Sequence, residues 1–472
     1  MKQRWTLHVR NFGPIQSADI DIHPFMMFVG PNNSGKSFLT TLIWGLLTHG
    51  KLLLDASDPE NPAYKACCDW LSREENAARE YIDNNNYAMD ANYTSKLEDD
   101  DVKLFVDWFN ESLHMRKKEL LKVLFNNVSI NANELSVSKY KRYSPVKIDW
   151  EFSEKTYNDY KIDGFRIIFC FARQKTIKTD RLKLLLYYII FEGLGNVLGN
   201  MAGMGGIYDF YNLDNSSLYL PSSRTGFMLN FRSLASSTIG QGFSRQYRSK
   251  GLHTAPTIRF LQGLIDLPIL ERGTQYDDVI GWLERDVIKG VFVRKDDVLP
   301  DYYYTPQQSN QALPLHVCSS LVTELAPLML FLKGSEQYGS LIIEEPEAHL
   351  HPAAQRKVAQ ALVRLVNRGL PVWITTHSDI MFQQINNLIT LSHFPNRTEI
   401  CQSMGYEESD ILDPKDAMAY QFIMTEHGTV VDPLTLIETG FAAPSFNKTL
   451  SDLTAETIRL HDLTDDLENS AS

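Results

Sequence analysis

The chain has 472 residues, 43% of them hydrophobic and 22% charged, as expected for a globular protein large enough for two lobes. Its formal net charge of −12 argues against a protein that coats nucleic acid over its whole surface, although a local basic groove is compatible with it. The sequence has no signal-peptide pattern, no apolar run of bilayer length and no C-x-x-C pair among its five cysteines, so it predicts a cytoplasmic protein with reduced thiols and no membrane contact.

The N-terminal residues predict a β-hairpin that leads into a third strand. Two apolar-rich runs, 5–9 and 20–22, flank the turn-prone sequence of residues 11–14. The run 25–29 is then expected to form a short buried strand. Apolar residues that recur at helical spacing predict a helix further on: Phe38, Leu39, Leu42, Ile43, Leu46 and Leu47.

The sequence GPNNSGKS, from Gly30 to Ser37, lies between this strand and this helix and fits the phosphate-binding loop pattern G-x-x-x-x-G-K-[ST]. Glycines let backbone N–H groups turn toward phosphate oxygens, and the following helix presents its positive N-terminal end. Lys36 would reach the β- and γ-phosphates, and the Ser37 hydroxyl would complete a Mg²⁺ shell. The strand and helix context disfavours an ordinary glycine-rich turn. The predicted nucleotide-binding residues are Gly30, Pro31, Asn32, Asn33, Ser34, Gly35, Lys36, Ser37 and Phe38.

The next part of the chain carries no motif that assigns it a function. The polar sequence 56–97 contains a loop signal at residues 84–86, and a helix is predicted over 99–124. Alternating apolar residues predict strands around 128–130, 146–148 and 165–168, and a strongly apolar helix is predicted over 180–198. No heptad repeat is sustained, so we expect no long coiled-coil arm.

From residue 217 onward strand-like and helical patterns return. A strand over 217–220 ends in the sequence PSSRTG, and four basic residues without an acidic one follow between 242 and 265. Strand-like pieces at 291–293, 302–304 and 313–317 precede an apolar helix over 319–332. The four basic residues, which are the candidate basic groove, are Arg245, Arg248, Lys250 and Arg259.

A buried strand over 341–343 ends in Glu344 and Glu345, the arrangement that a metal-assisted phosphate site needs. The first acid would lie near Mg²⁺ and the second would polarise the attacking water, whereas two solvated glutamates are the alternative. A helix over 353–368 and a strand over 372–375 complete a β-α-β unit. This unit places His377 at the carboxyl end of a parallel strand, and we interpret it as a γ-phosphate sensor.

These motifs resemble a known group of proteins. GPNNSGKS, LIIEEPEAHLHP (341–352) and TTHS (375–378) are similar to the ABC-type ATPase heads of the SMC/Rad50/RecF and OLD-like group. LYLPSSRTG and SSLVTELAPLMLFL are similar to the AAA15/AAA21 ATPases of prokaryotic phage-defence systems, such as the ATPase subunits of PARIS, Septu and retron-associated systems. The resemblance, over about 1–50, 215–240 and 310–390, implies that the loop binds ATP, Glu344 supports Mg²⁺, Glu345 is the hydrolytic base and His377 is the switch histidine.

The motifs and the resemblance together imply an α/β fold, namely an ABC-type P-loop ATPase head with an N-terminal β-hairpin, a mostly parallel sheet flanked by helices and a mixed helical/β insertion lobe. Residues 1–50 and 216–390 would form the two halves of the head. Residues 51–215 would form the insertion lobe, and 391–472 would add a C-terminal α/β extension.

The sequence also departs from the pattern of this group. Glu344 stands where many relatives have aspartate, and residues 318–321 read CSSL where the segment that caps ATP from the opposite subunit has Ser-Gly-Gly. Ser319 and Ser320 remain the candidates for that contact, because they can donate from a helix N-terminus. No glutamine loop is evident, and Arg224 is the candidate to replace it near the metal, with a structural arginine as the alternative.

Two functions from different classes remain open. In the first, the chain is a regulatory ATPase that senses an invader through a phage protein and controls a separate effector, a nuclease. It would act as a homodimer or higher homo-oligomer, and it would cut no nucleic acid by itself. In the second, it is a DNA-binding repair or maintenance ATPase that grips nucleic acid with the segment 245–259. The acidic balance and the missing arm favour the first.

Overall fold

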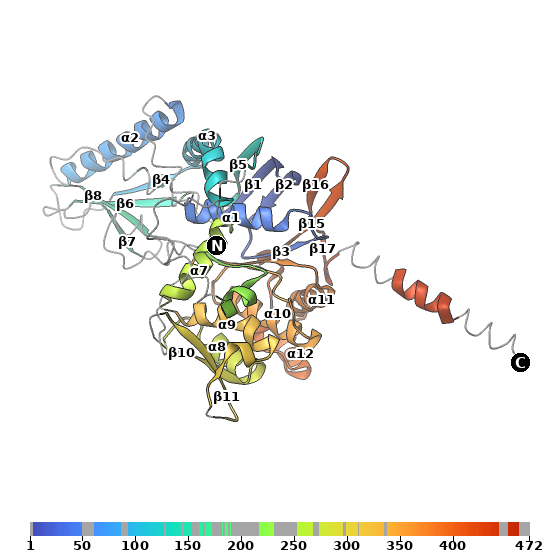
Figure 1. The fold of residues 1–472 in the computed structure, drawn as a ribbon. Helices are drawn as coiled ribbons and strands as arrows, with labels where there is room; N and C mark the ends of the chain where they lie inside the picture. Colours follow the sequence, from blue (N-terminus) through green and yellow to red (C-terminus); the bar gives the residue numbers. More distant parts are fainter. Residues whose placement is uncertain are drawn as a thin grey trace, which may run out of the picture.

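The computed structural model describes residues 3–49, 61–85, 93–126, 129–142, 146–152, 160–163, 166–171, 182, 185–186, 189, 217–230, 253–267, 273–295, 299–309, 311–334, 338–442 and 452–461. A nine-stranded mixed sheet lies at its centre, with the strand order β5-β1-β2-β16-β15-β3-β14-β13-β9 (Figure 1). Helices cover the sheet, which confirms the predicted α/β fold.

The N-terminal hairpin is confirmed. Strand β1 (Gln3–Phe12) pairs antiparallel with β2 (Ile15–Asp21), and both Gly13 in the turn between them and Asn11 near the end of β1 have positive φ. Strand β3 (Phe25–Val29) follows and is buried along its whole length. It leads through the glycine-rich loop into helix α1 (Lys36–His49), as the apolar periodicity predicts.

Four strands next to one another run parallel. They are β3, β14 (Val372–Thr376), β13 (Leu341–Glu344) and β9 (Leu218–Leu220). On the other side of β3, β15 (Ala417–Thr425) is also parallel to it, and β16 (Gly428–Pro433) joins β15 to the hairpin strand β2. Part of the expected C-terminal extension therefore lies inside the sheet, and the four-part division of the chain itself remains a prediction.

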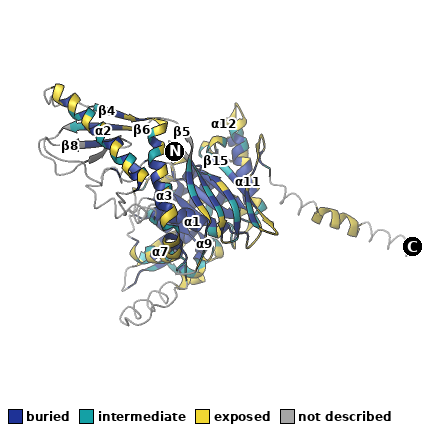
Figure 2. Cartoon of the chain, turned by 90° about the horizontal axis from the view of Figure 1, so that it is seen from above, coloured by how far each residue is buried: buried dark blue, intermediate teal, exposed yellow. Residues whose placement is uncertain are grey.

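The alternation of side chains along the buried strands supplies a core on each face of the sheet. In β3, Met26 and Phe28 belong to one core, and Phe25, Met27 and Val29 belong to the other. The first core packs under α1, α2 (Pro62–Asn84) and α3 (Asp99–Leu124). The second packs under α7 (Ala255–Asp266), α8 (Asp277–Trp282), α9 (Ser320–Lys333), α10 (Pro352–Asn367) and α11 (Asp379–Thr390). Figure 2 shows the buried centre between these helices.

The remaining elements form smaller units. A four-stranded sheet has the order β4-β6-β8-β7, a three-stranded sheet the order β10-β11-β12, and β17 pairs with β18. The bounds are β4 (Tyr93–Leu97), β5 (Glu134–Arg142), β6 (Val146–Phe152), β7 (Tyr160–Asp163), β8 (Arg166–Phe171), β10 (Gly290–Lys295), β11 (Asp301–Pro306), β12 (Leu313–Pro314), β17 (Leu436–Ile437), β18 (Gly440–Phe441), α12 (Arg397–Met404) and the short helices η3 (Leu283–Val287), η4 (Leu315–Val317), η5 (Leu391–His393), η6 (Glu408–Asp410) and η7 (Pro414–Asp416).

The predictions for the segment 51–215 are partly wrong. Helix α3 and strands β6 and β8 lie where they were expected, but residues 129 and 130 belong to no strand, and the strand instead begins at residue 134 and extends the main sheet as β5. Helix α2 occupies a stretch for which the sequence analysis predicted no helix and described only a polar composition and a loop signal. The Asn61 side chain caps it by accepting hydrogen bonds from the backbone N–H groups of Ala63 and Tyr64, and Pro62 suits its first turn.

Two further expectations fall on segments of which the structure describes only some residues. Of the predicted helix over 180–198, only Leu182, Leu185, Leu186 and Ile189 are described, and they are helical and buried. Arg245, Arg248 and Lys250 lie outside the described residues, while Arg259 lies on α7. In the described parts of the chain, no helix combines the length and the apolar character needed to cross a membrane.

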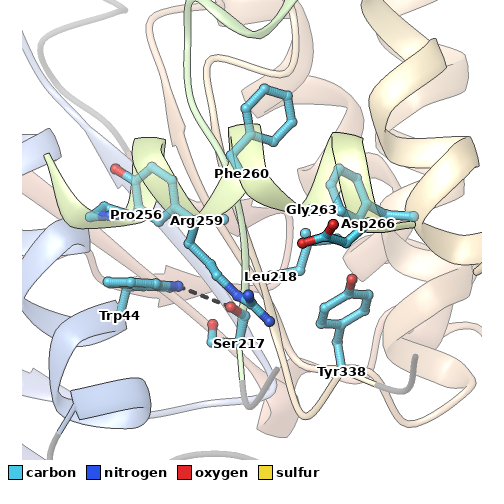
Figure 3. Close-up of a pocket in the computed structure, with 11 residues that line it drawn as sticks. Trp44, Ser217, Leu218, Pro256, Arg259, Phe260, Gly263, Asp266 and Tyr338 are labelled. Carbon is cyan, nitrogen blue, oxygen red and sulfur yellow. Dashed lines mark hydrogen bonds between the residues drawn. The ribbon is translucent and has the colours of Figure 1, made fainter. Parts of the chain in front are cut away.

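A small cavity of about 90 Å³ lies between α1, β9 and α7 (Figure 3). Trp44 donates a hydrogen bond from its indole Nε1 to the Ser217 carbonyl at the edge of this cavity. Trp44 lies about 12 Å along α1 from the glycine-rich loop, given the helical rise of about 1.5 Å per residue. Trp44 therefore lies away from the loop, whereas Tyr219, which also lines the cavity, reaches Thr40 on α1 with its hydroxyl.

Candidate nucleotide site

The loop between β3 and α1 has the backbone shape that its glycines allow. Gly30 and Gly35 have φ values of 150° and 100°. A Cβ atom at Gly30 would lie 2.8 Å from the Phe422 carbonyl oxygen, and one at Gly35 would lie 2.9 Å from Ile15 Cγ1. Any side chain at these two positions would therefore clash and strain the loop.

Lys36 is held inside this loop. Its Nζ donates hydrogen bonds to the carbonyl oxygens of Gly30, at 3.0 Å, and Pro31, at 2.8 Å. Burial lowers the pKa of Lys36 to about 8, although the carboxylates of Glu345, Glu344 and Glu347 oppose this. A buried ammonium near three carboxylates is a charged cluster of the kind that functional sites contain.

The two carboxylates after β13 lie in different environments. Glu344 is 6% exposed, and its Oε2 accepts a hydrogen bond from the Ser222 backbone N–H at 3.1 Å. The side chain of Glu345 is 40% exposed, and its backbone has a positive φ of 45°. The backbone N–H of Glu345 donates to the Thr375 carbonyl at 2.9 Å, which ties the end of β13 to β14.

The residues present fit a Mg²⁺ ion. Glu344 Oε1 is buried and has no hydrogen-bond partner, so one oxygen of a buried carboxylate is left for another ligand. Ser37, at the start of α1, is exposed, and its hydroxyl is available. Carboxylate and hydroxyl oxygens are the hard ligands that Mg²⁺ prefers.

His377 lies next to Glu345, at the end of β14. Its Nε2 is 3.7 Å from Glu345 Oε1. Burial and the charge of Lys36 lower the pKa of His377, against a smaller opposing effect of Glu345. The ring is therefore neutral at pH 7 and carries one N–H donor.

Glu347 is a third acid of the site that the sequence motifs alone did not single out. Its Oε1 accepts hydrogen bonds from the Thr376 hydroxyl and from the His377 backbone N–H, both at 2.7 Å. Burial raises the pKa of Glu347, while these two hydrogen bonds oppose the rise. Glu347 thus fixes the backbone that carries His377. The only signal for it in the sequence was its place two residues after Glu345.

Tyr219 on β9 is a second residue that the motifs did not reveal. Its hydroxyl lies 3.1 Å from Thr40 Oγ1 on α1. Burial, with a contribution from Glu344, raises the pKa of Tyr219 well above its usual range. This tyrosine therefore stays protonated and links the helix that follows the loop to the strand beside β13.

Arg224 lies behind the end of β13, near the carboxylates of Glu344 and Glu345. Arg224 is 1% exposed, and its Nη1 donates to the Glu344 carbonyl at 2.7 Å. Its guanidinium also forms an ion pair with Glu324. Both acceptors belong to the protein, which favours the structural alternative, and a role of Arg224 beside the metal stays a prediction.

Ser319 and Ser320 lie at the N-terminal end of α9. Both are exposed, and the Ser319 carbonyl accepts the first hydrogen bond of the helix from the Thr323 backbone N–H. Within this single chain no described hydrogen bond or ion pair joins the two serines to Lys36, Glu345 or His377. Their contact with ATP bound to a second copy of the chain stays a prediction.

The strand-loop-helix unit with Lys36, beside parallel strands that end in Glu344 and His377, defines an α/β domain of the P-loop class. Comparison with protein families then identifies the family. The model of the AAA ATPase domain family AAA_15 matches residues 5–187 and 268–382, which is more than half of the chain. The chain belongs to this ATPase family.

Solved structures with detectable similarity include the SMC head bound to the C-winged helix domain of ScpA, with 10% identity over 92% of this chain and 98% of that one and a TM-score of 0.37. The SMC head domain from Thermotoga maritima shows 9% identity over 92% and 100%, with a TM-score of 0.33. The ADP conformation of an ATP-binding cassette of an ABC transporter shows 9% over 81% and 85%, with a TM-score of 0.27. Comparison with curated proteins gives no match.

The pKa of Lys36 generates a prediction for ATP affinity. Below about pH 8 Lys36 is protonated in the free chain, whereas above it binding must be accompanied by proton uptake, because phosphates favour the ammonium form. We expect the affinity for Mg-ATP to fall by up to about tenfold per pH unit above pH 8. Fluorescence titrations between pH 7.5 and 9.5 would measure it.

The matched variant is Lys36→Arg, because a guanidinium keeps its proton throughout this range. Any affinity that this variant retains should not change with pH. A wild-type affinity that is constant from pH 7.5 to 9.5 would contradict a phosphate contact by a lysine whose pKa in the free chain is about 8.

Proposed function

We propose that this chain binds and hydrolyses ATP, with Mg²⁺, between the loop 30–38 and the ends of β13 and β14. One observation supports this above the others. The charge of Glu345 acts to raise the pKa values of Lys36 and His377, the charge of Lys36 acts to lower that of His377, and His377 Nε2 lies 3.7 Å from Glu345 Oε1, although Lys36 is far from the other two in the sequence. A cation, an acid and a neutral imidazole that lie close together suit the transfer of a phosphoryl group to water.

Each residue has a role in this proposal. Backbone N–H groups of the loop and Lys36 hold the phosphates, and Lys36 exchanges its two carbonyl partners for phosphate oxygens. Glu344 and Ser37 hold Mg²⁺, which neutralises charge on the β- and γ-phosphates when bound. Glu345, the more exposed carboxylate, accepts a proton from the attacking water. The His377 ring donates its N–H to the γ-phosphate.

The two carboxylates should therefore respond differently to the same substitution. Glu345→Gln is nearly isosteric but cannot accept the proton, so we expect kcat to fall by about 10²- to 10⁴-fold while ATP binding persists. Glu344→Gln should instead weaken the Mg²⁺-dependent part of ATP binding. Steady-state phosphate release and nucleotide titrations with and without Mg²⁺ would measure both effects.

Glu426→Gln, at the exposed turn between β15 and β16, is the matched control and should behave as the wild type. If the Glu344 and Glu345 variants lose the same property to the same extent, the proposed division of roles is wrong.

The proposal extends to assembly. The side of Glu345 and His377 that faces solvent is partly open, with 40% and 31% of their side chains exposed. Ser319 and Ser320 of a second copy would close it with donors at a helix N-terminus. The active form is thus a homodimer, or a higher homo-oligomer, that ATP stabilises.

Sedimentation of the Glu345→Gln protein tests the assembly, because this variant should keep ATP bound. We expect a dimer with Mg-ATP and a smaller species without nucleotide. Ser320→Arg, which places bulk on the docking end of α9, should abolish the dimer but not ATP binding. A Glu345→Gln protein that stays monomeric with saturating ATP would contradict the assembly.

The biological role we propose is that of a cytoplasmic regulatory ATPase in antiviral defence, which a phage protein triggers and which controls a separate effector, a nuclease. It is supported by the resemblance of the motifs over 218–226 and 319–332 to such ATPases and by the ATPase family. The alternative is a DNA-binding maintenance ATPase of the SMC type.

Purification at physiological salt distinguishes the two roles. We expect the product of a neighbouring gene to copurify in a fixed ratio and duplex DNA to bind only weakly. Tight duplex binding that falls steeply with salt concentration, without any copurifying protein, would favour the alternative.

A further inference from the structure

A buried ion pair lies directly behind the two carboxylates. Arg224, in the helical segment 224–230 after β9, donates from Nη1 to the Glu344 carbonyl at 2.7 Å and from Nη2 to the Glu345 carbonyl at 3.1 Å. Its Nη2 also lies 2.9 Å from Glu324 Oε2 on α9. Both charged side chains are only 1% exposed. One planar guanidinium therefore joins helix α9 to the backbone of both candidate catalytic acids.

The same polar network reaches the surface. The other carboxylate oxygen of Glu324, Oε1, lies 2.7 Å from His349 Nδ1. The His349 side chain is 70% exposed and belongs to the loop that follows Glu345. Glu324 itself stands in the second turn of α9, whose first residue is Ser320. The network thus connects an exposed loop and an exposed helix end with the interior of the site.

The backbone of Glu345 needs such support. With a φ of 45° this non-glycine residue has a left-handed conformation that side chains rarely adopt, and it persists only where its surroundings hold it. Its N–H donates to Thr375 on β14, and its carbonyl accepts from Arg224. The direction of the Glu345 side chain therefore depends on a hydrogen bond on each side.

We propose that Arg224 and Glu324 are positioning residues for ATP hydrolysis, which hold the Glu345 backbone in place and couple it to the N-terminal end of α9. A second copy of the chain that docks on Ser319 and Ser320 then acts on the hydrolytic base through this ion pair. The inference rests on the proposed function, in which Glu345 is the base. It adds two buried residues that touch neither ATP nor the metal.

Arg224→Lys is the test variant. Lysine keeps the positive charge, but a single ammonium cannot reproduce the fork that serves two carbonyls and one carboxylate. We expect kcat to fall on the order of 10²-fold, as for a small displacement of a reacting group, while the ATP dissociation constant changes by less than about threefold. Glu324→Gln, which keeps the shape but removes the charge, should lower kcat in the same way and to a smaller extent.

The matched control is Arg364→Lys. Arg364 on α10 also forms a buried ion pair, with its Nε 2.6 Å from Asp410 Oδ1, but it holds the segment 408–410 and not the site. This variant should lose a similar amount of stability in urea unfolding and keep the wild-type kcat.

Wild-type kcat in folded Arg224→Lys and Glu324→Gln proteins would overturn the inference. The inference would also be overturned if the Arg224→Lys and Arg364→Lys variants both lost kcat in proportion to their unfolded fractions. If Arg224→Lys does not fold, the same criteria applied to Glu324→Gln decide. A wild-type chain without ATPase activity would contradict the proposed function as well, whereas an active wild type with unaffected variants would contradict this inference alone.

Discussion

The candidate site depends on three neighbouring parallel strands that end at the same edge of the sheet. The register pairs Val29 of β3 with Thr376 of β14, and Thr375 of β14 with Glu344 of β13. Because parallel strands present their carboxyl ends together, this register brings the loop after β3 to residues about 300 positions later in the chain. Without it, Lys36, Glu345 and His377 would be unrelated side chains.

The same edge gathers charges that the protein alone does not fully balance. Burial lowers the pKa of Lys36 and raises that of Glu347, so each group loses more solvation than its neighbours restore. Glu344 keeps a buried oxygen without a hydrogen-bond partner. A polyphosphate with a divalent cation would supply a partner for these groups, since it would bring negative charge to Lys36 and positive charge to the carboxylates. Electrostatics and geometry therefore point to the same ligand class.

The sequence revealed those parts of the site whose chemistry is local. The loop pattern, the strand that ends in Glu344 and Glu345, and the strand before His377 each lie within a few consecutive residues, and the structure has these elements where they were expected. Parts that depend on distant contacts were not predicted. Strands β15 and β16 enter the middle of the sheet between β2 and β3, whereas the sequence analysis predicted only an α/β extension over 391–472.

Contacts between distant residues also could not be predicted for individual side chains. Glu324 looks like an ordinary polar position on an apolar helix, and its role follows only from the buried contact with Arg224. Arg224 likewise gave no sign in the sequence that its guanidinium is buried against the Glu344 carbonyl and Glu324, which are distant in the chain. In the segment 51–215, α2 went unrecognised because its mean hydropathy is low, and its buried face, with Cys67 and Trp70, became clear only against α3.

The most direct test of the nucleotide site is a structure of the protein with Mg²⁺ and a non-hydrolysable ATP analogue. The account predicts phosphates on the loop 30–37, Lys36 released from the Gly30 and Pro31 carbonyls, and the metal bound by Ser37 and Glu344, with Glu345 facing the γ-phosphate. A nucleotide bound elsewhere on the chain, with Lys36 still bonded to the two loop carbonyls, would contradict it.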